Sequence, residues 1–264
     1  VLINQGLTPS EIFFYRFGIA YIGIWILKPH RLFASNLRDE LWLLAGGLFG
    51  GSLYFYTENT ALGITQASNV AFIVSTSPLL TTILSLIIYK NEKASKGLIY
   101  GSFIALFGVA LVVFNGSVIL KLSPVGDLLS FVAALSWAFY GLIIKKMATR
   151  YPTVFITRKI FFYGILTILP TFLIHPLDPN LSLLLQPEIG FNLLFLGVIA
   201  SLICFVLWNV TLKKLGPILT SNYIYLVPLI TMIASSLILD EKITPIALGG
   251  ALCILCGVYW AEKR

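Results

Sequence analysis

The chain has 264 residues, of which 58% are hydrophobic and 11% are charged, and its formal net charge is +7. A soluble globular domain has roughly 45–50% apolar and about 25% charged residues, so this chain has too few polar side chains to cover a water-facing surface. The composition indicates a membrane protein, and we expect the lipid bilayer rather than nucleic acid as its partner.

Nine apolar stretches are candidates for membrane-spanning helices. About 20 apolar residues cross the hydrocarbon core as a helix, and only helices or closed barrels satisfy their own backbone hydrogen bonds in lipid. The stretches are too long for barrel strands and do not alternate as such strands do, so we expect helices throughout. In chain order they are Ile12–Leu27, Leu41–Thr57, Ala67–Tyr89, Gly97–Leu120, Leu128–Ile144, Ile160–Ile174, Ile189–Leu212, Leu215–Leu239 and Ile243–Ala261.

Residues 54–108 are repeated, about 150 residues later, in residues 204–257. Each copy reads as an apolar helix interrupted by proline, a short charged turn and a second apolar helix that carries glycines. An internal duplication of apolar segments is typical of a secondary transporter built from two halves. The matched positions are Asn59 and Asn209, Ala61-Leu62 and Thr211-Leu212, Pro78 and Pro228, then, after one deletion, Asn91-Glu92-Lys93 and Asp240-Glu241-Lys242, and Gly108 and Gly257.

The same duplication predicts a helix before Val1. When Pro9 is set against Pro152, Val1 falls opposite Ile144, at the end of an expected span. We therefore expect a preceding helix of about 20 residues. The expected fold class is an all-α polytopic membrane protein with a ten-helix inverted-repeat (5+5) transporter fold, nine spans of which lie in this chain. Residues 1–120 would form the first repeat and residues 121–264 the second.

Basic residues gather on one side of the expected spans. Thirteen Lys and Arg fall in loops on that side, and two, Lys121 and Lys242, fall on the other. Cytoplasmic loops carry the excess of Lys and Arg, so we expect both termini of the complete chain in the cytoplasm and the protein in the cell membrane. Five spans is an odd number, so the second half would be inverted. The thirteen are Lys28, Arg31, Arg38, Lys90, Lys93, Lys96, Lys145, Lys146, Arg150, Lys213, Lys214, Lys263 and Arg264.

Proline interrupts the corresponding helix in each half. Pro78 removes the helical partner of the Val74 carbonyl, and Pro228 removes that of the Ile224 carbonyl. A freed carbonyl is satisfied either by nearby Ser and Thr side chains, as in an ordinary kink, or by water and ligand in a substrate cavity. Both alternatives stay open for these two helix breaks.

Polar and aromatic residues recur at matched depths in the two halves. An arginine at the centre of a membrane-spanning helix costs at least ~2.5 kcal/mol, so Arg16 should face protein or water. We expect aromatic rings to shape a cavity around an organic substrate, asparagines to hydrogen-bond it, and Arg16 or Lys159 to meet a carboxylate; each residue could instead serve packing. The candidate substrate-binding residues are Arg16, Tyr54, Glu58, Asn59, Asn69, Trp137, Tyr140, Lys159, Asn209, Asn222, Tyr223 and Tyr225.

Glycines mark places where helix backbones approach closely. Two overlapping GxxxG spacings lie in residues 46–51. They indicate tight helix packing or a glycine face on the substrate path. Glycines also mark the expected spans Gly97–Leu120 and Ile243–Ala261, which would either pack within the chain or face a second copy in a homodimer.

Cys253 and Cys256 form a CxxC pair within an expected span. In another setting this spacing would suggest metal or redox chemistry. There is no second cysteine pair and no histidine close by in the sequence, so we expect small packing residues here, and neither a metal nor a cofactor.

The order of these motifs resembles the drug/metabolite transporter superfamily, and specifically its EamA-type permeases. The resemblance implies a ten-helix inverted-repeat carrier that moves a small metabolite, often an amino acid or a related compound, or a toxic organic molecule. Thr211 stands where alanine is usual, which is a conservative departure. The residues that carry the resemblance are Ala61-Leu62, Pro78, Glu92 and Gly108 in the first half, Leu212, Pro228, Glu241-Lys242, Gly249 and Gly257 in the second, and Arg16 and Gly126-Asp127.

We therefore expect a secondary transporter, not an enzyme, that exports a small organic solute by alternating access. The alternative is a membrane-embedded enzyme or a flippase acting on lipid-linked substrates. Such an enzyme needs clustered acids, histidines or metal ligands, whereas His30 and His175 are expected on opposite sides of the membrane. The sequence has no GxxxxGK[ST] run, so ATP does not drive transport by this chain. Glu58 is a candidate for proton coupling.

Overall fold

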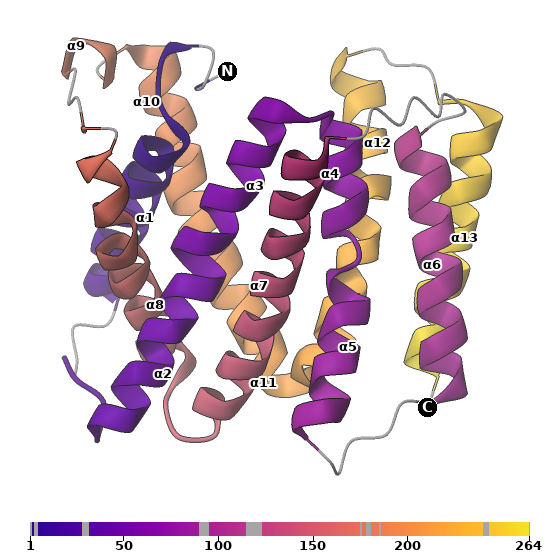
Figure 1. Ribbon diagram of the computed structural model, residues 1–264, viewed down its shortest axis with the longest axis horizontal. Coiled ribbons are helices and arrows are strands. Elements are labelled where there is room, and N and C mark those ends of the chain that lie inside the picture. Colours follow the sequence, from indigo (N-terminus) through magenta and orange to yellow (C-terminus); the bar gives the residue numbers. More distant parts are fainter. Residues whose placement is uncertain are drawn as a thin grey trace. The chain divides into compact units, whose positions relative to one another are not determined.

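The computed structural model describes residues 2, 5–27, 32–89, 95–114, 123–174, 176–177, 181–184, 186–239 and 243–263. Within these ranges every regular element is a helix (Figure 1). The expected all-α class is therefore confirmed for this part of the chain. The two charged turns of the duplication, Asn91-Glu92-Lys93 and Asp240-Glu241-Lys242, and both histidines, His30 and His175, lie outside the described residues.

The helices include α-helices, 3₁₀ turns and two π-helical segments, η2 and η4. In chain order they are α1 (Pro9–Leu27), α2 (Leu37–Gly47), η2 (Leu48–Ser52), α3 (Leu53–Ile64), α4 (Ala67–Val74), α5 (Ser77–Ile88), α6 (Lys96–Phe114), α7 (Pro124–Ala148), α8 (Thr153–Ile168), η3 (Leu169–Leu173), α9 (Leu181–Leu184), α10 (Pro187–Leu194), η4 (Phe195–Ile203), α11 (Cys204–Asn222), η5 (Tyr223–Leu226), α12 (Val227–Leu239) and α13 (Pro245–Glu262).

Six helical stretches in the described residues are long and apolar enough to cross a membrane. The longest, Pro187–Ala234, is broken at Gly216, whose φ of 79° and ψ of 168° lie in a region that favours glycine. That break separates two of the expected spans. The chain is thus a polytopic helical protein, and the count of ten helices stays a prediction.

The described helices group into two compact units. The first unit comprises Val1–Asn59 and Phe139–Lys214, and the second comprises Thr60–Ala138 and Leu215–Arg264. Each unit takes residues from both expected repeats. The boundary between the repeats, placed after residue 120, therefore differs from the division into units and stays a prediction.

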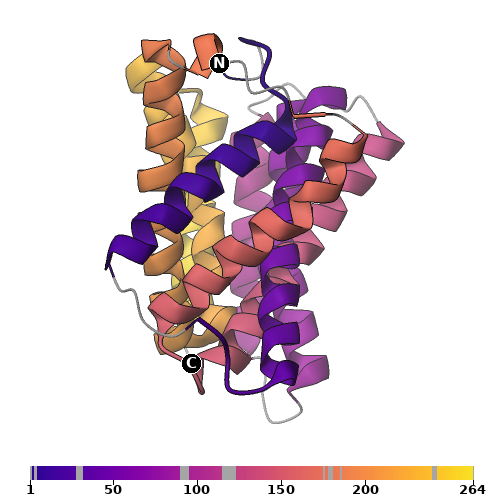
Figure 2. The same ribbon diagram turned by 90° about the vertical axis from the view of Figure 1, so that its left-hand side faces the viewer.

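In the first unit, α1 and α8 pack against each other, and each also contacts a π-helical segment (Figure 2). α1 packs on η4, where a Cβ added to Gly197 would lie 2.7 Å from the Ile19 side chain. α8 packs on η2, and a Cβ added to Gly47, the residue before η2, would lie 2.8 Å from the amide nitrogen of Gly164. The two glycines are equivalent in the duplication, which places them 150 residues apart.

In the second unit, α6 and α13 lie side by side and antiparallel, with their glycines in contact (Figure 1). A Cβ at Gly101 would lie 2.4 Å from the carbonyl oxygen of Gly257, and one at Gly108 would lie 2.6 Å from that of Gly250. Only residues without a side chain permit such an approach. The glycine faces that could have served packing or a second copy therefore meet each other within the chain.

The break before Pro78 is bridged by hydroxyl groups. α4 ends at Val74 and α5 begins at Ser77, whose hydroxyl donates to the Val74 carbonyl. The Thr76 hydroxyl likewise donates to the Ile73 carbonyl at 2.6 Å. Hydroxyl side chains at the kink thus donate hydrogen bonds that a water or a ligand could have supplied. Pro228 differs, because it is the second residue of α12 and follows the 3₁₀ turn η5.

Candidate functional site

Arg16 of α1 lies beside η4 and α3 within the first unit. Its Nε donates to Ser201 Oγ at 2.9 Å, and its guanidinium carbon lies 4.4 Å from the centroid of the Phe55 ring. The Tyr54 hydroxyl donates to Glu58 Oε1 at 2.9 Å, and the charge of Glu58 is close enough to attract that of Arg16. We call these five residues the Arg16 cluster. It combines a cation, a carboxylate and aromatic rings, which suits a ligand that carries both signs of charge.

The π-helical segment η4 positions Ser201 next to Arg16. Its counterpart η2, residues 48–52, falls on residues 198–202 in the duplication, inside η4. A π-helical segment widens the helix, and such segments occur frequently at functional sites. In η2 the backbone of Gly51 departs from helical values, with φ −122° and ψ −105°. The sequence carries no periodic signal for these segments, so sequence reasoning missed them.

Tyr140 and Asn209, two predicted substrate contacts, are joined by a buried chain of hydrogen bonds. The Tyr140 hydroxyl donates to Asn209 Oδ1 at 2.6 Å, and Asn209 Nδ2 donates to Thr157 Oγ1 at 2.9 Å. All three side chains are fully buried. Gly50 makes room for the ring, because a Cβ there would lie 2.2 Å from Tyr140. These two hydrogen bonds join α7, α8 and α11 to one another.

Lys159 meets a carboxylate, and that carboxylate belongs to the protein. Its Nζ lies 2.7 Å from Glu40 Oε1, and the Tyr163 hydroxyl donates to Glu40 Oε2 at 2.7 Å. The backbone amide of Ala34 also donates to Oε1 at 2.9 Å. Glu40 was not among the predicted residues. Its partners are 119 and 123 positions away in the chain, a separation at which sequence spacing gives no signal.

Asp39, next to Glu40 at the start of α2, binds a second basic residue. Its carboxylate accepts from Arg150 Nη1 at 2.7 Å and from the Tyr151 hydroxyl at 2.8 Å. Burial by itself raises the pKa of Asp39, but the Tyr151 hydrogen bond and the Arg150 charge outweigh it and hold the pKa below its ordinary value. Burial likewise raises the pKa of Glu40, and the hydrogen bonds from Lys159, Ala34 and Tyr163 lower it by more.

The remaining candidates lie in the second unit, apart from Asn59, which lies on α3 in the first. Asn222 is fully buried, and among the described residues neither atom of its amide has a hydrogen-bond partner. A buried polar group without a partner costs about 1–3 kcal/mol, so a water or a ligand there would be stabilised. Tyr225 packs in the core between α6 and α13, and Tyr223 is 40% exposed. Asn69 is buried and Trp137 half-buried.

The structure thus gathers some candidates and separates others. Within the first unit Arg16, Tyr54 and Glu58 form one cluster, Tyr140 and Asn209 form another, and Lys159 pairs elsewhere. The role of every candidate toward a substrate stays a prediction. In the described part of the chain no three metal-binding side chains come together.

The chain matches the EamA-like transporter family over residues 2–114 and 124–261. It is also similar to a solved crystal structure with a TM-score of 0.80, over 98% of this chain and 90% of that one. The sequence identity to that structure is 17%, so the likeness concerns the fold alone.

Relatives of similar length are described as transporters. An uncharacterized transporter of Archaeoglobus fulgidus is 28% identical over 98% of this chain and 89% of its own length. The uncharacterized transporter YyaM of Bacillus subtilis is 29% identical over 97% of this chain and 85% of its own. A probable amino-acid metabolite efflux pump of Escherichia coli is 22% identical, covering 88% and 80%.

Proposed function

Because the chain belongs to the EamA-like transporter family, we propose that it exports a small organic metabolite across the cell membrane by alternating access. The fold would be an inverted repeat of two five-helix halves. Transporters of this architecture carry their substrate site where the two repeats meet, and the repeats move relative to each other to open the site to either side. The observation that carries the proposal is the reciprocity of contacts within each unit.

In the second unit, two glycine contacts correspond to each other under the duplication. Gly101 contacts Gly257, and Gly108 contacts Gly250. The duplication matches Gly108 with Gly257, and the same spacing matches Gly101 with Gly250, so one contact becomes the other when the two copies are exchanged. A contact between i and j that also occurs between j and i is typical of a two-fold relation.

The first unit has the same property to within one residue. Ser52 on η2 bonds Thr167 near the end of α8, at 2.7 Å between the hydroxyl oxygens. In the duplication, Ser52 corresponds to Leu202, and Thr167 corresponds to a residue next to Gly23 on α1. A Cβ at Gly23 would lie 2.7 Å from the Leu202 side chain. Two copies that exchange contacts in this way, while their helices run antiparallel, support an inverted repeat.

The opposite charges of the Arg16 cluster favour a zwitterionic substrate, such as an amino acid or a related compound. The carboxylate of the substrate would replace part of the attraction between Arg16 and Glu58, and its ammonium group would bind Glu58. Phe55 and Tyr54 would contact the apolar part of the solute. The name of the Escherichia coli relative, a probable amino-acid metabolite efflux pump, supports the same class.

The orientation proposed for the complete chain has both termini in the cytoplasm, as the distribution of basic residues favours. In that orientation the Arg16 cluster would lie toward the outer side, and Asp39 and Glu40 toward the cytoplasm. A gradient of an ion or of the solute itself would drive transport. The Glu58 carboxylate, held by Tyr54, is the group proposed to take up a proton if the driving ion is H⁺.

Counterflow in proteoliposomes tests the proposal. Liposomes that contain the full-length protein are loaded with an unlabelled amino acid, and entry of the same isotope-labelled compound is followed for a panel of zwitterionic and neutral solutes. We expect exchange of at least one zwitterion, reduced about tenfold or more by Arg16→Gln, because a hydrogen bond to a charged group contributes about 1.5–3 kcal/mol.

Lys214→Gln is the matched control, because it removes the same charge from an exposed position and should leave exchange unchanged. Absence of exchange for every solute by folded protein would contradict a transporter of small solutes. Movement of a labelled lipid between leaflets without solute exchange would instead favour the flippase alternative.

A further inference from the structure

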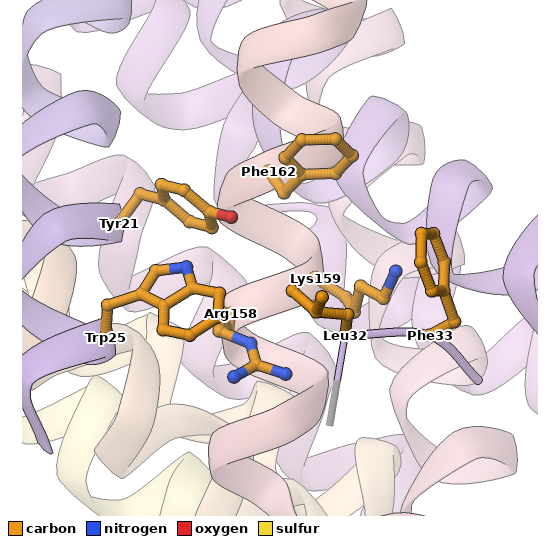
Figure 3. Close-up of a pocket in the computed structure, with 7 residues that line it drawn as sticks. All are labelled: Tyr21, Trp25, Leu32, Phe33, Arg158, Lys159 and Phe162. Carbon is orange, nitrogen blue, oxygen red and sulfur yellow. The ribbon is translucent and has the colours of Figure 1, made fainter. Parts of the chain in front are cut away.

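The basic residues of the first unit include a buried pair and an exposed group. The buried pair, Arg158 and Lys159, lines a cavity of about 230 Å³ (Figure 3). The Arg158 guanidinium carbon lies 4.6 Å from the centroid of the Trp25 ring, and Lys159 Nζ lies 2.7 Å from Glu40 Oε1. Protein groups engage both of these cations, so a ligand outside the protein would meet the exposed group first.

The exposed group lies where the end of α7 meets the start of α2. Lys146 Nζ, in the last turn of α7, lies 3.7 Å from the centroid of the Trp42 ring on α2. Arg38 precedes Trp42 by four residues, a spacing that puts both side chains on one face of α2. Arg150, which follows α7, donates to the Asp39 carboxylate at 2.7 Å. We call Arg38, Lys146 and Arg150 the α2–α7 basic cluster.

The cluster has more positive than negative charge. The charges of Arg38 and Arg150 are close enough to repel that of Lys146, and among the described carboxylates only Asp39 is close enough to attract it. The two oxygens of Asp39 already accept from Arg150 and from the Tyr151 hydroxyl. Within the described ranges neither Arg38 nor Lys146 forms an ion pair, so two cations stay without a neutralising carboxylate.

The cluster lies at the end of a stretch that is long and apolar enough to cross a membrane, Pro124–Ala148. Leu37 and Leu41, which precede Arg38 and Trp42 on α2, are 75% and 57% exposed. Tryptophan and basic side chains are typical of the headgroup layer of a bilayer, and exposed leucines beside them would contact acyl chains. A ligand that fits therefore carries an anionic group next to an apolar chain.

We propose that the α2–α7 basic cluster binds the phosphate of an anionic phospholipid, with Arg38 and Lys146 as its donors and the acyl chains against Leu37 and Leu41. A guanidinium presents five N–H donors and an ammonium three, which suits the oxygens of a phosphate. Arg150 and Tyr151 hold the Asp39 carboxylate, which would otherwise compete with the phosphate for the two cations. Basic clusters next to membrane helices attract anionic headgroups.

Lipid retention by the full-length protein tests the proposal, and it requires no transport, so it is independent of the proposed function. The protein is incorporated into nanodiscs of phosphatidylcholine and phosphatidylglycerol in equal amounts and extracted into mild detergent. The lipids that stay bound are counted by native mass spectrometry. We expect phosphatidylglycerol to be preferred more than tenfold. Arg38→Gln should lower the preference about fivefold, since one basic group near the surface contributes about that much in affinity.

Two double variants keep the outcomes distinct. Arg38→Gln with Lys146→Gln should remove most of the preference, whereas Arg38→Lys with Lys146→Arg keeps both charges and should keep most of it. Arg38→Gln alone changes an exposed residue, so it should fold even if the loss of Lys146 from the Trp42 ring disturbs the double variant.

Lys213→Gln with Lys214→Gln is the matched control. It removes the same charge from exposed positions of α11 in the same unit, and neighbouring residues of a helix point in different directions. This variant should keep the preference. The proposal is overturned by an unchanged preference in Arg38→Gln, by an equal loss in the control, or by displacement of the lipid with millimolar glycerol 3-phosphate, which would identify a soluble phosphate as the ligand.

Discussion

Substituting alanine for Gly257 should weaken the pairing of α6 with α13. The added Cβ would lie 2.4 Å from the amide nitrogen of Ala105 and 2.5 Å from the carbonyl oxygen of Gly101. Backbone atoms cannot rotate away as side chains can, so the helices must separate by about 1 Å to reach ordinary contact distances. Forcing extra volume into a packed core costs about 1–3 kcal/mol.

Gly249→Ala provides the matched control on the same helix. A Cβ at Gly249 would meet no atom within 4 Å. Alanine favours helix over glycine by up to about 1 kcal/mol at both positions, so the propensity gain cancels in the comparison. The difference in unfolding free energy between the two variants then isolates the cost of the close contact, and we expect Gly257→Ala to be the less stable by about 1–3 kcal/mol.

Reversible unfolding by sodium dodecyl sulfate in mixed micelles measures this difference. The exchange of contacts between the two copies also predicts that Gly108→Ala, at the matching position of α6, destabilises by a similar amount, because its Cβ would lie 2.6 Å from the carbonyl oxygen of Gly250. Equal stability of Gly257→Ala and Gly249→Ala would refute the close packing. A large cost at Gly257 with none at Gly108 would refute the reciprocity.

Two further predictions concern the first unit. The pKa values of Asp39 and Glu40 are lowered on folding, so their stabilisation is fully present above the ordinary carboxyl pKa of about 4 and is lost as the pH falls through the lowered values; unfolding followed from pH 7 to pH 3 should show this loss, and Glu40→Gln should show less of it. Tyr140→Phe should destabilise by about 1–3 kcal/mol in the micelle assay, because Asn209 Oδ1 would stay buried without its donor; an unchanged midpoint would mean that the hydrogen bond contributes nothing.

The duplication in the sequence picked out residues that lie in one helix contact, although the matched residues do not contact each other. Gly108 and Gly257 were matched on spacing alone, and both lie in the contact of α6 with α13. Hydrophobic runs likewise predicted helices, because a chain with so few charges has to satisfy its backbone within each helix. Such regularities are local or periodic, which is why a sequence displays them.

Contacts between distant side chains could not be predicted in this way. Arg16 or Lys159 was expected to meet a carboxylate of the substrate, and no spacing in the sequence indicated that Glu40, which precedes Lys159 by 119 residues, pairs with it. The π-helical segment that brings Ser201 to Arg16 also left no trace in the apolar pattern, because one extra residue in a turn does not change which residues are apolar. These features depend on how α1, α2 and α8 pack together.

Labelling of single cysteines from the two sides of the membrane tests most directly whether the halves are inverted. Lys96 and Pro245 begin α6 and α13, are exposed, and occupy matching positions in the two copies. In a full-length protein with Cys204, Cys253 and Cys256 replaced by serine, Lys96→Cys should react with a membrane-impermeant maleimide from the cytoplasmic side only, and Pro245→Cys from the opposite side only. Reaction of both cysteines from the same side would contradict the inverted repeat.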